Sequence, residues 1–239
     1  MSILAVEGLT RQFKGLRAIQ DLSFAVEARS ITSIVGPNGA GKSTLFNMIS
    51  GYLKPTAGRV LFEGREITGK PPHLVCGMGI ARAFQIAKPF PELSVEKNVL
   101  VAATFGRLGP RDPQATTERA IEICHLTARR NQPASALSIG NLRRLELARA
   151  IAARPTLLLA DEPCAGLSPA ETHRMVEAIR NAVQRLQAAA LLIEHDLAAV
   201  AALQGEVYVL HQGQLLAQGP LAALQADPAV QAVYAGASK

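Results

Sequence analysis

The chain has 239 residues, 49% of them hydrophobic and 18% charged, so it can bury a sizeable core and is not a disordered polymer. Its net charge of +6 comes from scattered Lys and Arg residues without a long basic run, which argues against a nucleic-acid-binding protein and suits a polyphosphate ligand or a nearby anionic membrane. The longest apolar run, residues 197–203, is far shorter than the roughly 20 residues that cross a bilayer, and the first residues lack a signal-peptide pattern. We therefore expect a soluble, cytosolic chain that reaches a membrane only through a partner.

Hydrophobic periodicity gives the expected elements. In chain order they are strands over 3–9, 19–26 and 31–35, a helix over 42–50, a strand hairpin over 58–64, helices within 92–136, a helix over 142–153, a strand over 156–160, a helix over 170–188, a strand over 189–193, a helix over 197–203 and a strand over 207–210. Alternation of helix and strand in the second half predicts βαβ units and a parallel sheet. We expect one α/β domain over 1–239, with its core in about 1–87 and 137–239 and a helical subdomain in about 88–136.

A glycine-rich segment follows the third expected strand. Residues 36–43, Gly-Pro-Asn-Gly-Ala-Gly-Lys-Ser, fit GxxxxGK[ST] between a strand and a helix. In that setting backbone N–H groups converge on phosphate oxygens, and the helix N-terminus adds partial positive charge. Lys42 would reach the β- and γ-phosphates, and the Ser43 hydroxyl would reach Mg²⁺. The segment predicts a site for ATP and Mg²⁺ rather than an ordinary glycine-rich turn.

Two acids end the apolar strand expected over 156–160. Asp161 would hold Mg²⁺, and Glu162 would take a proton from an attacking water. A strand that ends in Asp-Glu is by itself a common helix-cap or surface pattern. Downstream of a phosphate-binding loop, it favours metal binding and general-base catalysis. The isolated cysteines Cys76, Cys124 and Cys164, in contrast, indicate structural thiols rather than metal or redox chemistry.

A third motif, Leu-Ser-Ile-Gly-Asn at residues 137–141, opens a helix just before this strand. Here the sequence resembles the ABC ATPase family, whose LSGGQ signature sits on the γ-phosphate of the ATP held by a partner subunit. Ser138 and Gly140 match that signature. Ile139 replaces a glycine and Asn141 replaces a glutamine, so the contact with the partner's nucleotide is in question. The resemblance implies a P-loop NTPase core with a mixed or parallel sheet, an antiparallel β subdomain and a helical insert.

Further matches follow in the family's order. Phe13 corresponds to the aromatic residue that stacks on adenine, Gln85 to the Q-loop glutamine that touches Mg²⁺, and His195 to the switch histidine of the γ-phosphate. Ser168 stands where many members have Asp, so it receives no catalytic role. The implied nucleotide-binding residues are Phe13, Gly36, Pro37, Asn38, Gly39, Ala40, Gly41, Lys42, Ser43, Thr44, Ser138 and Gly140. The implied catalytic residues are Lys42, Gln85, Glu162 and His195, and the implied Mg²⁺ ligands are Ser43, Gln85 and Asp161.

The segments around residues 143–149, 161–167 and 192–197, with the tail over 212–236, look like ATP-binding subunits of branched-chain amino acid importers. The resemblance implies a peripheral protein on the cytoplasmic face of the cell membrane. Its partners would be membrane permease subunits, a second ATP-binding subunit in a homo- or heterodimer and, indirectly, a solute-binding protein, with no nucleic acid.

Three alternatives remain at this point. An importer of urea or another small solute uses a very similar subunit. A soluble ABC ATPase of DNA repair or translation usually carries long coiled coils or two cassettes, which this length does not accommodate. A non-hydrolysing subunit would be expected to lack Lys42, Glu162 or His195, all of which are present.

Overall fold

A six-stranded sheet, in the order β10-β9-β3-β8-β7-β6, forms the centre of the computed structural model, which describes residues 1–107 and 112–236. Strands β6 to β9 run parallel to β3, and β10 pairs antiparallel to β9 at one edge. Their bounds are β3 Ile31–Val35, β6 Ile80–Ala83, β7 Leu157–Asp161, β8 Ala189–Ile193, β9 Glu206–His211 and β10 Gln214–Pro220. Strands β7 and β8 are apolar almost throughout, as expected for parallel strands covered on both faces.

A second, antiparallel sheet has the order β2-β1-β4-β5. Its strands are β1 Ser2–Phe13, β2 Leu16–Glu27, β4 Ala57–Phe62 and β5 Arg65–Glu66. Strands β1 and β2 extend beyond the ranges expected from sequence because the two-residue turn Lys14-Gly15 joins them, with φ of 36° and 96°. Two consecutive positive φ angles are typical of tight hairpins whose twist matches that of the strands. The mixed and the antiparallel sheets of the expected fold are both confirmed.

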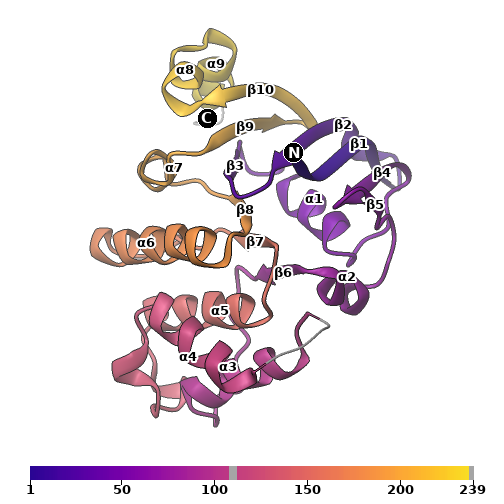
Figure 1. The fold of residues 1–239 in the computed structure, drawn as a ribbon. Helices are drawn as coiled ribbons and strands as arrows, with labels where there is room; N and C mark the ends of the chain where they lie inside the picture. Colours follow the sequence, from indigo (N-terminus) through magenta and orange to yellow (C-terminus); the bar gives the residue numbers. More distant parts are fainter. Residues whose placement is uncertain (108–111, 237–239) are drawn as a thin grey trace.

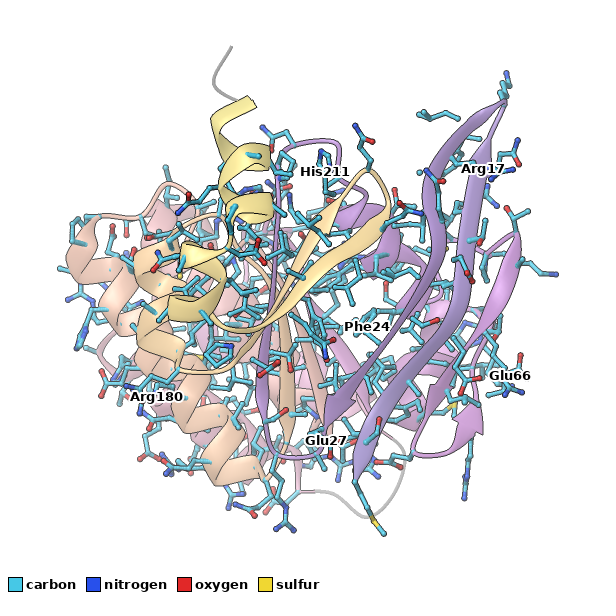
Figure 2. The ribbon with its side chains drawn as sticks, turned by 90° about the horizontal axis from the view of Figure 1, so that it is seen from above. Arg17, Phe24, Glu27, Glu66, Arg180 and His211 are labelled. Carbon is cyan, nitrogen blue, oxygen red and sulfur yellow. The ribbon has the colours of Figure 1, made fainter. Side chains whose placement is uncertain are left out.

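Alternate side chains of the central strands enter two different cores. Leu158 and Ala160 of β7 join a cluster formed with the helices on one face of the sheet. Leu157 and Leu159 join a second cluster formed with α1 (Lys42–Ile49) and the antiparallel sheet. Figure 1 shows these layers, and Figure 2, turned by 90°, shows Phe24 of β2 pointing toward the central sheet, where it packs on Tyr208 of β9 with ring centroids 5.3 Å apart. This layering follows from the two-residue period of a β-strand.

Helices of the middle segment pack together on one side of the molecule (Figure 1). Helices α3 (Val95–Phe105) and α4 (Pro113–Ile123) contact α5 (Ile139–Ala152), and 3₁₀ turns at Thr127–Arg129 and Ala134–Ala136 complete the connection. Helix α5 begins earlier than the sequence pattern predicted, because Ser138 caps it and the signature residues form its first turn. This packing places the helical insert between β6 and α5.

The remaining helices are α2 (Pro72–Met78), α6 (Pro169–Leu186), α7 (Leu197–Leu203), α8 (Leu221–Ala226) and α9 (Pro228–Gly236). Sequence periodicity predicted α6 and α7 but missed α2, α8, α9 and the strands β6 and β10. Val230 of α9 and Leu224 of α8 join a small separate cluster with the valines of β9. Across the described ranges, every helix is too short or too polar to cross a lipid bilayer.

Candidate functional site

Strand register brings distant residues to one edge of the central sheet. Ala83 of β6 pairs with Ala160 of β7, and Asp161 of β7 pairs with Ile193 of β8. Ile34 of β3 also pairs with Ile193, so the segments after β3, β6, β7 and β8 all leave the sheet at the same edge. Ligands of open α/β sheets bind at this carboxyl edge. The fold therefore places the glycine-rich loop, Gln85, Glu162 and His195 beside one another although more than half of the chain separates them.

The glycine-rich loop is tightly packed against its surroundings. A Cβ on Gly36 would lie 2.1 Å from the carbonyl oxygen of Leu210, and one on Gly41 would lie 2.5 Å from that of Ala18. Both glycines also have positive φ, of 150° and 102°, so no other residue fits either position without rearrangement. The loop ends at Gly41, and helix α1 starts at Lys42. Its backbone N–H groups and the helix N-terminus are thus held in the geometry of an anion-binding loop.

Lys42 closes this loop from inside. Its Nζ donates to the carbonyl oxygens of Gly36, at 2.7 Å, and Pro37, at 2.9 Å. Burial lowers the pKa of Lys42, whereas the carboxylates of Glu162 and Asp161 oppose that shift. Asp161, at the end of β7, and Glu162, directly after it, therefore lie close enough to Lys42 to interact with its charge.

A cleft of about 670 Å³ opens over the loop. Its lining includes Phe13 and the cluster Asn38, Gly39, Ala40, Gly41, Lys42, Ser43, Thr44, Glu162 and His195. Phe13 is 39% exposed, and the Arg11 guanidinium lies 4.5 Å from the centre of its ring. The structure thus gathers an aromatic platform, a phosphate-type loop and an acid–histidine pair around one opening. That combination suits a nucleoside polyphosphate.

Glu162 is held from two sides. Its Oε2 accepts a hydrogen bond from Gln85 Nε2 at 2.6 Å, and its Oε1 lies 3.0 Å from His195 Nε2. Its backbone has a φ of 48°, which is unusual for a residue other than glycine and is often found at functional sites. The carboxylate is only 18% exposed at its side chain. Gln85 and His195, which follow the different strands β6 and β8, therefore fix the position of this acid at the mouth of the cleft.

Asp161 lies deeper than Glu162. Its Oδ2 forms an ion pair with Arg82 of β6 at 2.6 Å, and both side chains are at most 8% exposed. Its Oδ1 is buried and has no hydrogen-bond partner among the described residues. Asp161, Ser43 and Gln85 line a second cavity of about 490 Å³ next to the cleft. A free carboxylate oxygen, a hydroxyl and an amide oxygen form a donor set that fits Mg²⁺, which prefers oxygen ligands and retains several waters.

Ser138 and Gly140 lie outside the cleft, at the first turn of α5. Ser138 Oγ accepts from the backbone N–H of Asn141 at 3.4 Å and from its side-chain Nδ2 at 3.0 Å. Asn141 is buried, and its Oδ1 accepts from Arg144. Ile139 instead is 68% exposed. The signature residues therefore do not line the nucleotide cleft of their own chain. The sequence prediction of a contact with a partner's nucleotide stays a prediction.

A buried carboxylate, Glu194, links two loops at this edge. Its Oε1 accepts from the N–H of Cys164 at 2.8 Å, and its Oε2 accepts from the N–H of His195 at 3.1 Å. Burial raises the pKa of Glu194, and burial together with Glu194 raises the pKa of the Cys164 thiol. Sequence reasoning missed Glu194 and Arg82. The available signal was a charged residue next to or within an apolar strand, at Leu-Leu-Ile-Glu and Ile-Ala-Arg-Ala.

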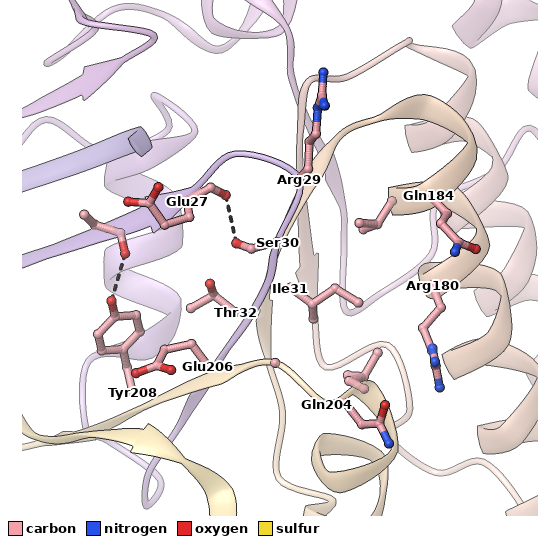
Figure 3. Close-up of a pocket in the computed structure, with 14 residues that line it drawn as sticks. Glu27, Arg29, Ser30, Ile31, Thr32, Arg180, Gln184, Gln204, Glu206 and Tyr208 are labelled. Atoms are coloured by element: carbon pink, nitrogen blue, oxygen red, sulfur yellow. Dashed lines mark hydrogen bonds between the residues drawn. The ribbon is translucent and has the colours of Figure 1, made fainter. Parts of the chain in front are cut away.

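A third cavity, of about 640 Å³, opens at the opposite end of the strands (Figure 3). It is lined by the starts of β3 and β9, with Glu27 and Glu206 on one side and Arg180 of α6 on the other. Tyr208 donates its hydroxyl to the carbonyl of Ala25 at 2.8 Å at its border. The glycine-rich loop follows the other end of β3, so this cavity is separate from the nucleotide cleft.

The glycine-rich loop, the strand-end acids and the adjacent histidine define a P-loop ATPase cassette. Residues 19–165 match the ABC transporter family. The high-affinity branched-chain amino acid transport ATP-binding protein BraF of Pseudomonas aeruginosa is 35% identical over 98% of both chains, and LivG of Salmonella typhimurium is 38% identical over the same shares. A crystal structure of an ABC transporter ATP-binding cassette in its ADP conformation has a TM-score of 0.88 and 31% identity over 99% of both chains. The chain belongs to this family, as one of its ATP-hydrolysing cassettes.

Proposed function

We propose that this chain is the ATPase subunit that drives import of branched-chain or other amino acids through a separate membrane permease. The chain itself would lie on the cytoplasmic face of the cell membrane. The observation that carries the proposal is the position of the Glu162 carboxylate, which contacts Gln85 and His195 and lines the cleft over the glycine-rich loop. The similarity to BraF and LivG, both branched-chain amino acid transport ATP-binding proteins, supports the choice of solute.

In this proposal each side chain has one task. Phe13 supports the adenine, and backbone N–H groups from Gly36 through Thr44 hold the phosphates. Lys42 exchanges the carbonyls of Gly36 and Pro37 for phosphate oxygens. Glu162 accepts the proton of the attacking water, while His195 contacts the γ-phosphate. The clamped geometry of Glu162 supports the general-base role, because a base must be positioned before its pKa matters.

Mg²⁺ belongs to the proposal as well. Ser43, Gln85 and Asp161 would hold it, since the three residues line one cavity beside the cleft. Bound there, Mg²⁺ neutralises charge on the β- and γ-phosphates. The buried Oδ1 of Asp161, which has no partner in the described part of the chain, supports this assignment, because a polar atom without a partner inside a protein is costly unless something binds it.

A second subunit completes each ATP site. Ser138 and Gly140 would supply the signature contact from the partner, in a homo- or heterodimer. Their location on the first turn of α5, away from their own cleft, supports this division of labour. Residues of about 88–136 would form the helical subdomain that passes the nucleotide state to the permease, and an extracytoplasmic solute-binding protein would act through that permease.

The docking edge for the permease would be the loop at residues 89–95. Phe90 is 46% exposed, and its backbone N–H and carbonyl are both bonded to the Asn98 side chain, so the loop has a fixed shape. Arg149 of the signature helix α5 donates to the carbonyl of Lys88 at 3.0 Å, and its guanidinium lies 5.8 Å from the Phe90 ring. This contact joins the signature helix to the proposed edge, which is what transmission requires.

A solute-uptake assay tests the function directly. Cells that lack this gene should lose uptake of labelled leucine, isoleucine or valine, and the wild-type gene should restore it. Restoration of urea uptake alone would replace the amino acid assignment with the small-solute alternative. Retention of all uptake would reject the transport role.

Substitutions at the docking edge test the coupling. Phe90→Ala and Leu93→Asp should leave the ATPase rate of the lone subunit unchanged but reduce permease co-purification and solute uptake about tenfold or more, because lost interface anchors cost about 2 kcal/mol or more. Phe105→Ala is the matched control, since Phe105 is 79% exposed at the other end of α3. Full co-purification and uptake in the Phe90 and Leu93 variants would place the docking surface elsewhere.

A further inference from the structure

Arg82 is buried between three elements that carry nucleotide-site residues. It lies on β6, three residues before Gln85, and its Nη2 binds Asp161 Oδ2 at the end of β7. Its Nη1 donates to Asn47 Oδ1 at 2.7 Å and to Ser50 Oγ at 3.1 Å, both at the far end of helix α1. The guanidinium also lies 4.9 Å from the centre of the Phe84 ring. A planar, multidentate cation is thus fixed by contacts on several sides.

This arrangement makes the two oxygens of Asp161 different. Oδ2 is committed to Arg82, whereas Oδ1 is buried and has no hydrogen-bond partner within residues 1–107 and 112–236. Asp161 and Ser43 line the same cavity, where a metal ion would bind, and Arg82 leaves only Oδ1 of Asp161 uncommitted. As long as the Arg82 contact persists, Asp161 can offer a metal ion, or a water bound to that ion, one oxygen only.

The number of available oxygens matters for the choice of ion. Ca²⁺ takes six to eight oxygen ligands and often binds carboxylates through both oxygens, whereas Mg²⁺ needs octahedral geometry, keeps several waters and uses few protein ligands. A carboxylate restricted to one oxygen therefore disfavours Ca²⁺ more than Mg²⁺. Groups that orient metal ligands in this way typically change metal affinity by about 10- to 100-fold when they are substituted.

We infer that Arg82 is a positioning residue that holds Asp161 to single-oxygen coordination and thereby makes the nucleotide site prefer Mg²⁺ over Ca²⁺. The inference rests on the proposed Mg²⁺-ATP site. It assigns to Arg82 a role beyond stability, and that role predicts a change in ion preference as well as in affinity.

The experiment measures equilibrium ATP binding by the full chain in EDTA, in Mg²⁺ and in Ca²⁺, by displacement of a fluorescent ATP analogue. In Arg82→Lys the ammonium is too compact to hold Asp161, Asn47 and Ser50 together. Affinity in EDTA should stay within about twofold of wild type. The Mg²⁺ concentration for half-maximal tightening should rise about 10- to 100-fold, and the preference for Mg²⁺ over Ca²⁺ should fall about tenfold. Arg130→Lys, which alters an ion pair with Glu96 in the helical insert, is the control and should change neither quantity.

The outcomes separate the inference from the proposed function. A wild-type chain whose ATP affinity ignores Mg²⁺ would reject the proposed site itself. If the wild-type chain responds to Mg²⁺ but Arg82→Lys keeps the same ion preference, the role of Arg82 is rejected. The role is also rejected if Arg82→Lys loses as much ATP affinity in EDTA as it does in Mg²⁺. Asn47→Ala keeps the ion pair but releases the other end of the guanidinium, so it should shift the preference in the same direction to a smaller extent. If Arg82→Lys fails to fold, an unchanged preference in Asn47→Ala overturns the inference.

Discussion

The nucleotide cleft and the signature turn differ in how much of their chemistry is satisfied within one chain. In the cleft, Lys42 and Glu162 each have two polar partners from the same chain. At the signature turn, the side chains of Ser138 and Asn141 bind each other, and Asn141 also binds Arg144, while the apolar Ile139 is 68% exposed. One region is preorganised for a ligand, and the other presents a surface that its own chain does not cover.

This difference is a physical argument for assembly. Preorganised donors reduce the cost of ordering at the moment of binding. In the proposed dimer, the exposed Ile139 at the first turn of α5 would be covered by the partner chain. The cleft should therefore respond to substitutions in a single chain, and the signature turn only when two chains meet.

The largest effect is expected at Glu162. In Glu162→Gln the amide can keep a contact with Gln85 or His195 but cannot take a proton from water, so hydrolysis should fall by about 10²- to 10⁴-fold while ATP binding persists. Steady-state phosphate release and equilibrium ATP binding measure the two quantities. Unchanged turnover would show that Glu162 is not the general base, and another group would have to accept the proton of the attacking water.

An intermediate effect is expected at Ile139. Ile139→Gly should tighten ATP-dependent dimerisation about tenfold, because a bulky side chain that crowds the partner's ATP costs about 1–3 kcal/mol. Sedimentation in the Glu162→Gln background, where dimers should accumulate, measures the dissociation constant. The wild-type chain without nucleotide should be mostly monomeric and weakly active, with a specific activity that rises with protein concentration.

Two companion variants separate side-chain size from backbone flexibility at this position. Ile139→Ala should give part of the gain, and Ile139→Trp should weaken dimerisation. A gain with Gly but none with Ala would attribute the effect to the helix N-terminus rather than to crowding. A specific activity that does not depend on protein concentration would contradict the expectation that the signature turn acts only when two chains meet.

The smallest effect concerns stability and pH at Glu194. Its raised pKa means that the unfolded chain loses this proton first as the pH rises, so the native state loses stability between the ordinary Glu pKa, about 4.3, and the raised value. Glu194→Gln lacks this ionisation, and its single acceptor oxygen leaves the N–H of Cys164 or His195 without a bond, at about 1–3 kcal/mol. The variant should thus be less stable than wild type near pH 5, and the difference should shrink toward pH 8. Urea unfolding of both proteins at several pH values measures this difference in the free energy of unfolding. A difference that widens as the pH rises would contradict the prediction.

Much of this architecture could be predicted from sequence because its signals are local. The glycine-rich loop has its fixed spacing, and the apolar strands β7 and β8 end at recognisable polar residues. Strand β6 lacked such a signal: Ile-Ala-Arg-Ala is short, contains a charge and carries little β propensity, and only pairing with β7 makes it a strand. Strand β10, at the opposite edge, likewise pairs with a single strand of the sheet, β9.

The contacts that position the site could not be predicted, because they join residues far apart in sequence. Arg82 and Asp161 are 79 positions apart, and Glu194 and Cys164 are 30 apart. A lone charge beside an apolar strand indicates a buried partner but does not identify it. The register of the parallel strands determines which residue becomes the partner, and register between distant strands depends on the whole fold.

The carbonyl contacts of Lys42 have a kinetic consequence. The ammonium rests on the oxygens of Gly36 and Pro37, so contacts within the chain itself hold the curvature of the loop. In the proposed site, entry of a nucleotide would exchange the acceptors of this cation without a folding step of the loop. Association should consequently follow second-order kinetics up to high nucleotide concentration, with no plateau from a slow conformational gate.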